Sequence, residues 1–168
     1  MRSIRRTNPL AAALLSARPA PERAAGLELY AWLIGAWTMD ATVHLLDGNL
    51  HRGARSIAVA WVLEGRAIQD VWVLPGMFHG TTLRVYDPTR DAWHILWSDL
   101  LYQYYSRQIS RAEGQDIVQL GANDGGVPTR WSFRDITHDS FTWRGETSND
   151  GGAHWQLEAE FLCRRDRA

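Results

Sequence analysis

The feature that most constrains this chain is a series of turn signals that recurs about every 8–15 residues from Trp37 onward. The segments between the signals are rich in Val, Ile, Thr and aromatic residues, and none leaves room for a helix. This pattern is typical of consecutive antiparallel strands. We count about ten strands, and a meander of that length removes its unpaired edges only by closing. The sequence therefore predicts an all-β fold, a closed antiparallel barrel of about ten strands. The turn signals are Asp47-Gly48-Asn49, Glu64-Gly65, Pro75-Gly76, Asp87-Pro88, Glu113-Gly114, Asn123-Asp124-Gly125-Gly126, His138-Asp139 and Asn149-Asp150-Gly151-Gly152.

The residues before this series are predicted to form two helices. Asn8-Pro9 starts the first, because asparagine caps a helix and proline is tolerated at its first position. A second helix is expected over residues 22–34, and Gly35 fits its end because a residue without Cβ takes the left-handed conformation cheaply. The apolar stripe of that second helix consists of Leu29, Trp32 and Leu33.

We therefore divide the chain into a helical extension, residues 1–34, and a barrel, residues 35–168. Three arginines, Arg2, Arg5 and Arg6, precede a short apolar run and loosely resemble a secretory signal. The run is short for such a signal and begins with Pro9. The sequence favours a cytoplasmic protein.

Charge and residue spacing exclude several classes of function. The formal net charge is -1, which gives no electrostatic basis for binding nucleic acid or an anionic membrane. The six histidines show no metal-ligand spacing, and there is no phosphate-binding loop or Gly-x-Ser-x-Gly elbow. The single cysteine, Cys163, is interpreted as a small packed hydrophobe. We expect no metal and no cofactor.

The hairpin around Glu64-Gly65 places one carboxylate on an apolar face. A two-residue turn pairs Val59 with Asp70, so that Asp70 lies between Ile68 and Trp72 along its own strand. If this face is interior, Asp70 needs a partner, and we predict Arg55 on the neighbouring strand. Asp70 is then either half of a structural ion pair or a ligand anchor and general acid/base.

Two further groups of polar residues are candidates for chemistry. Pairing Val85 with Trp93 places Arg84 opposite His94, on a face that is either solvent-exposed or functional. The stretch 102–107 begins a strand with three tyrosines, Tyr102, Tyr104 and Tyr105, which either line a pocket mouth or are ordinary strand aromatics. As catalytic candidates we name Asp70, His94 and Tyr104.

Nine tryptophans in 168 residues are a large excess, and most fall on the predicted apolar faces. They either fill a dry barrel or line a cavity, and a barrel of about ten strands is wider than side chains fill comfortably. We therefore expect a cavity for a hydrophobic or aromatic ligand. The predicted ligand-binding residues are Arg55, Trp61, Trp72, Arg84, Trp97, Tyr102, Tyr105, Trp131 and Trp143.

Three segments resemble a family of bacterial lipocalin-like domains of unknown function, within the calycins. They are the helix followed by Gly35-Ala36-Trp37, the hairpin 61–70 with Gly65-Arg66 at its turn, and Val85-Tyr86-Asp87-Pro88-Thr89 followed by Trp97-Ser98-Asp99. The resemblance implies a lipocalin-like barrel with a ligand cavity and brings no catalytic residues. In calycins an arginine from the last strand often packs over the tryptophan of the Gly-x-Trp motif. The resemblance therefore implies that Arg164 or Arg165 covers Trp37.

Three functions follow as expectations. The first is binding of a hydrophobic or aromatic small molecule inside the barrel, in a monomer or a homodimer. The second is a small cofactor-free cyclase, isomerase or lyase that acts on a hydrophobic metabolite by acid/base catalysis. The third is haem binding, since Gly35-Ala36-Trp37 matches half of the Gly-x-Trp-x-Gly-x-Gly pattern of the nitrobindins, which hold haem through one histidine.

Overall fold

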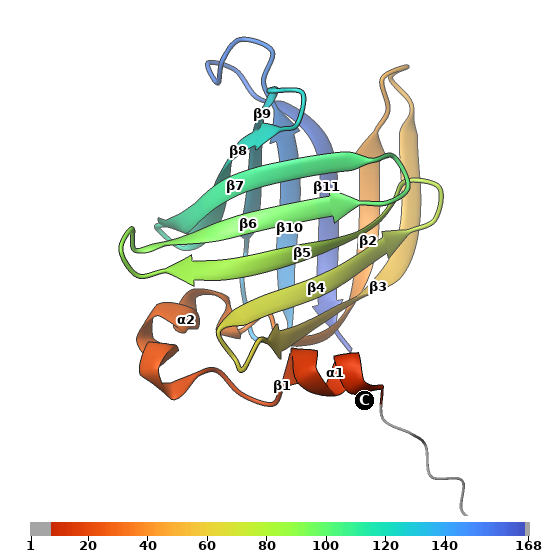
Figure 1. Cartoon of the computed structure of the whole chain (residues 1–168). Coiled ribbons are helices and arrows are strands. Elements are labelled where there is room, and N and C mark those ends of the chain that lie inside the picture. Colours follow the sequence, from red (N-terminus) through yellow and green to blue (C-terminus); the bar gives the residue numbers. More distant parts are fainter. Residues whose placement is uncertain (1–7, 167–168) are drawn as a thin grey trace, which may run out of the picture.

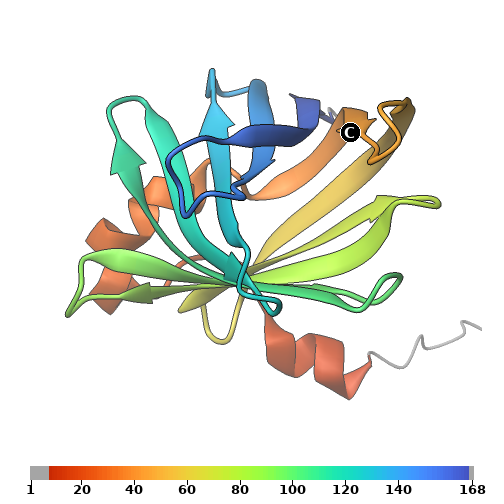
Figure 2. The same ribbon diagram turned by 90° about the horizontal axis from the view of Figure 1, so that it is seen from above.

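The computed structural model describes residues 8–166, and within them ten antiparallel strands close into one barrel. Each strand pairs with its neighbours in the chain, and β2 pairs with β11 to complete the circle. Figure 1 shows both helices near one end of the barrel, and Figure 2 shows β4 to β6 on one side of the interior with β10, β11 and β2 on the other. The elements are α1 (Pro9–Leu14), β1 (Leu15–Ser16), η1 (Pro21–Arg23), α2 (Ala24–Ala31), β2 (Gly35–His44), β3 (Leu50–Val62), β4 (Ala67–Leu74), β5 (Phe78–Asp87), β6 (Ala92–Asp99), β7 (Tyr104–Glu113), β8 (Asp116–Asn123), β9 (Pro128–Arg134), β10 (Ser140–Thr147) and β11 (Gln156–Arg165).

The predicted all-β barrel is therefore confirmed, and an eleventh, two-residue strand lies outside the closed ring. β1 pairs with the end of β3, with Leu15 opposite Val62. The outer face of β3 carries small side chains, and β1 covers only its end, so that Ala54 and Ala58 stay exposed. The predicted homodimer stays a prediction, as does the division of the chain at residue 35.

The N-terminal helices differ in part from the expectation. Asn8 caps α1, since its side-chain oxygen accepts hydrogen bonds from the backbone N–H groups of Leu10 and Ala11. The second helix is shorter than residues 22–34, because a 3-10 turn precedes it and it ends at Ala31. The three arginines of the possible secretory signal, Arg2, Arg5 and Arg6, lie outside the described residues. No helix within residues 8–166 is long and apolar enough to cross a membrane.

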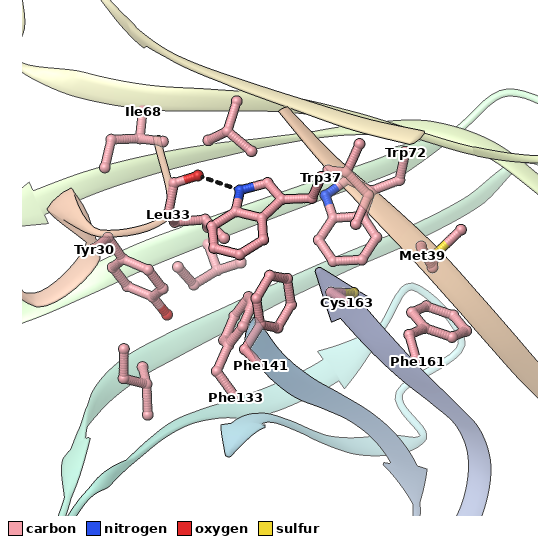
Figure 3. Packing of buried hydrophobic residues seen from close by; sticks show 14 of the residues in the cluster. Tyr30, Leu33, Trp37, Met39, Ile68, Trp72, Phe133, Phe141, Phe161 and Cys163 are labelled. Atoms are coloured by element: carbon pink, nitrogen blue, oxygen red, sulfur yellow. Dashed lines mark hydrogen bonds between the residues drawn. The ribbon is translucent and has the colours of Figure 1, made fainter. Parts of the chain in front are cut away.

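Helix α2 and the turn after it close one end of the barrel. Leu27, Tyr30 and Leu33 are almost completely buried, at the 3-residue spacing of one helix face. The predicted stripe shared only Leu33 with this set, and Leu29 and Trp32 are half-buried. The three residues pack into the same hydrophobic cluster as the strands, so the helix belongs to the core of the barrel (Figure 3).

Trp37 lies at the centre of this closed end. It is fully buried, and its indole Nε1 donates a 2.8 Å hydrogen bond to the carbonyl of Leu33 (Figure 3). Arg165, the last residue of β11, places its guanidinium 4.0 Å from the centroid of the Trp37 ring. The guanidinium also donates to the carbonyls of Trp32, Ile34 and His138, over 2.6–2.8 Å. Arg165 therefore joins the end of β11 to the turn that precedes β2.

The backbone of Gly35 makes this arrangement possible. Its φ is +128°, a conformation that residues with a side chain rarely adopt. A Cβ at this position would also come within 2.9 Å of Arg165 Nη1.

We predict that Arg165→Ala lowers the free energy of unfolding by about 3 kcal/mol, because three charge-assisted hydrogen bonds and a cation–π contact are lost together. The matched control is Arg164→Ala, whose exposed side chain belongs to the other face of the strand, and which should stay within about 0.5 kcal/mol of the wild type. Urea unfolding followed by tryptophan fluorescence measures both. Equal losses of unfolding free energy in the two variants would contradict the role assigned to Arg165.

Cys163 is a free, almost completely buried thiol of the core, as predicted. Burial, and secondarily the charge of Asp40, raises its pKa. Because the thiolate is the reactive form, we expect dithionitrobenzoate to react with Cys163 only as fast as the protein unfolds. The measurement is the absorbance change with and without denaturant, and rapid reaction of the native protein would show that the core is open at this point.

Candidate functional site

A cavity of ≈ 270 Å³ occupies the half of the barrel away from α2. Its wall consists mainly of aromatic side chains from several strands. Four of the nine tryptophans line it: Trp72 on β4, Trp97 on β6, Trp131 on β9 and Trp143 on β10. The cavity reaches the surface, because exposed residues of the rim, among them Tyr102, also line it.

The four tryptophans form a chain of ring contacts from Trp97 to Trp72. The ring centroids of Trp97 and Trp131 are 6.2 Å apart, and those of Trp131 and Trp143 are 5.6 Å apart. Trp143 also stacks on Phe161 of β11, with 4.7 Å between the centroids and 15° between the planes. Contacts of this kind stabilise each ring in one orientation. The wall of the cavity is therefore preorganised for a flat or hydrophobic ligand.

An ion pair between Asp70 and Arg84 lies inside the barrel, and Arg84 lines the cavity. Both side chains are almost completely buried. Arg84 Nη1 donates to Asp70 Oδ2, while Asp70 Oδ1 accepts a 2.9 Å hydrogen bond from the backbone N–H of Thr82. The guanidinium of Arg84 also lies 5.3 Å from the ring centroid of Tyr30. Asp70 is thus fully engaged, and it does not line the cavity.

The predicted pairing of Asp70 with Arg55 is therefore wrong. Its hairpin register was correct, since Val59 lies opposite Asp70. Arg55 lies opposite Met39 on β2 and is exposed. It belongs to the part of β3 that does not pair with β4. The interior cation comes instead from β5, where Arg84 lies two residues from Thr82 on the same face.

The predicted register of the β5–β6 hairpin is wrong by one residue. Arg84 lies opposite Ile95, and His94 lies opposite Val85. Four residues, 88–91, separate the paired Asp87 and Ala92, whereas the prediction required an odd number. A one-residue slip exchanges the two faces of a strand. Arg84 accordingly lies inside, while His94 lies on the outer face, where its Nε2 is 3.2 Å from Asp87 Oδ2.

The rim of the cavity carries two tyrosines and two carboxylates. Tyr102 donates a 2.7 Å hydrogen bond to the carbonyl of Gly76, which joins two neighbouring loops. Burial, and then the charge of Glu158, raises the pKa of Tyr104 to about 12. Asp99 is almost completely buried and accepts hydrogen bonds from the backbone N–H groups of His79 and Leu101.

Glu158 is a lining residue that the sequence did not reveal. Simple alternation along β11 assigned it to the outer face. The register shifts at this point, because Gly145 pairs with Ala159 whereas Glu146 pairs with Leu157. Glu158 is therefore left without an opposite residue, as in a β-bulge. The signal was Gly145, since a glycine inside a strand often marks a bulge.

Seven of the predicted site residues line the cavity together: Trp72, Arg84, Trp97, Tyr102, Tyr104, Trp131 and Trp143. The others do not. Trp61 is buried near the end of β3 that β1 covers. Tyr105 is exposed, and its hydroxyl donates to the side chain of Gln103. The role of each residue in binding or catalysis remains a prediction.

The cavity does not match the haem hypothesis, which requires one proximal histidine. No histidine of the described part of the chain lines it. Within residues 8–166 there is also no group of three or more His, Cys, Asp or Glu side chains that could hold a metal ion.

Fold and site together define a closed ten-stranded antiparallel barrel with an aromatic cavity, within the described residues. The crystal structure of Rv2717c from M. tuberculosis is similar, with a TM-score of 0.63 over 89% of this chain and 99% of that chain. The sequence identity is 13%, so that the similarity concerns the fold alone. No protein-family model matches the sequence, and no curated protein is significantly similar to it.

We predict that Asp70→Asn lowers the free energy of unfolding by about 3–5 kcal/mol, because it leaves the buried charge of Arg84 without a counter-charge. The amide keeps an oxygen for the N–H of Thr82. The double variant Asp70→Asn/Arg84→Met should recover most of the loss, since it removes the uncompensated charge. Urea unfolding of the three proteins tests this, and a double variant no more stable than Asp70→Asn would contradict it.

Proposed function

We propose that the protein is a lipocalin-like binding protein that holds a hydrophobic, aromatic small molecule in the barrel cavity. The observation that carries the proposal is the cavity of ≈ 270 Å³ with four tryptophans in its wall. An apolar pocket with a few polar groups at its ends is the usual form of a small-molecule site. The ring contacts hold this wall in place before any ligand arrives, which lowers the entropic cost of binding.

The geometry favours binding over acid–base catalysis. Of the three catalytic candidates, only Tyr104 lines the cavity. Asp70 is occupied by Arg84 and the backbone of Thr82, and His94 lies on the outer face with Asp87. A general acid or base must come within hydrogen-bonding reach of its substrate.

We predict that Ala159→Leu weakens binding of the neutral probe N-phenyl-1-naphthylamine at least about tenfold, because the larger side chain enters the cavity beside Phe161. Binding is measured by the quenching of tryptophan fluorescence and by the emission of the probe. Leu162→Ala is the matched control, since Leu162 is exposed on the other face of the same strand and should leave the affinity unchanged.

Two outcomes would contradict the proposal. One is the absence of saturable binding to the wild-type protein. The other is an Ala159→Leu variant that binds the probe as tightly as the wild type while keeping its fold, as judged by its circular dichroism spectrum.

A further inference from the structure

The charges around the cavity are unbalanced. Arg84 is the one basic residue in the wall among the described residues, and its charge is compensated by Asp70. Asp99 and Glu158 are also in the wall, and neither forms an ion pair with any residue of the described range 8–166. The wall therefore contains two carboxyl groups for which the described residues supply no cationic partner.

The two carboxylates are held by neutral donors. Asp99 accepts two backbone N–H groups, at 3.0 Å from His79 and 2.9 Å from Leu101. Glu158 Oε1 accepts a 2.9 Å hydrogen bond from the hydroxyl of Thr147. Such donors fix the carboxylates in place but do not cancel their charge. Glu158 reaches solvent at the rim, and the partial desolvation of its carboxylate raises its pKa.

The aromatic wall also favours a positively charged ligand. The faces of Trp72, Trp97, Trp131 and Trp143 carry the negative part of the ring quadrupole, and tryptophan is the strongest aromatic partner for a cation. The barrel interior already contains this interaction, since the guanidinium of Arg84 lies 5.3 Å and 5.7 Å from the ring centroids of Tyr30 and Phe133. Recognition of ammonium groups by aromatic cages has the same physical basis.

We infer that the cavity selects a hydrophobic organic cation, an aromatic amine or ammonium compound whose rings contact the tryptophans and whose positive charge faces Glu158 and Asp99. This inference rests on the proposed function and names the class of its ligand. A neutral aromatic ligand would leave the carboxylates uncompensated in an apolar site, and an anionic one would be repelled by them.

Three ligands of nearly equal shape test the inference. They are 2-naphthylmethylammonium, the neutral 2-naphthylmethanol and the anion 2-naphthoate, titrated by calorimetry at pH 7 and constant ionic strength. We expect the cation to bind about tenfold more tightly than the alcohol, and the anion to bind most weakly.

Glu158→Gln should lower the ratio of cation to alcohol affinity at least about threefold, because it removes one of the two charges. The matched control is Glu160→Gln on the same strand. Glu160 does not line the cavity and pairs with Arg144, so its variant should keep the wild-type ratio.

The outcomes separate this inference from the proposed function. An alcohol that binds as tightly as the cation, or an unchanged ratio in Glu158→Gln, would overturn the cation preference and leave a hydrophobic binding site. Failure of all three ligands and of N-phenyl-1-naphthylamine to bind the wild-type protein would overturn both.

Discussion

The ion pair of Asp70 with Arg84 is the constraint around which the interior of this barrel is arranged. A buried charge is tolerated only with a close counter-charge and further hydrogen bonds. Asp70 meets that requirement through Arg84 and the backbone of Thr82, so that β4 and β5 are fixed in one register. The interior is then divided in two. Trp37 and the residues of α2 fill the closed end, whereas the opposite half stays hollow.

How far the sequence predicted the fold depends on whether each turn was given an even or an odd number of residues. The turn around Glu64-Gly65 was given an even number, as the structure has it with residues 63–66 between the paired strands, and the pairing of Val59 with Asp70 was predicted correctly. The loop 88–91 allows more than one pairing, and the choice made was wrong by one residue. That single slip misplaced Arg84, because adjacent residues of a strand face opposite sides, whereas His94 lies on the face of β6 away from Trp93 and Ile95, as predicted. The packing of Arg165 over Trp37 was predicted only as one of two alternatives.

The candidate site was predicted in its apolar part and at Arg84, whereas the carboxylates of Asp99 and Glu158 were missed. Four tryptophans of the wall followed from alternation, which needs only a regular strand. Glu158 did not, because a register shift at Gly145 interrupts the alternation in β11. The partner of Asp70 was misassigned because ion pairs in a barrel join strands whose relative register no local pattern defines. Of the charged residues of the wall, Arg84 and Glu158 depend on a loop or a register shift, whereas Asp99 follows regular alternation along β6.

The pairing of β2 with β11 has a consequence for how the chain reaches this structure. Trp37 pairs with Arg165 in the ladder, a contact between the first and the last strand of the barrel. Contacts so distant in sequence cost much loop-closure entropy and slow folding. Until β11 has been synthesised, β2 has one neighbour and Trp37 lacks the guanidinium of Arg165, so one edge of β2 is unpaired on the nascent chain. The step that completes the ring therefore also removes unpaired strand edges, which are an aggregation hazard, from the growing polypeptide.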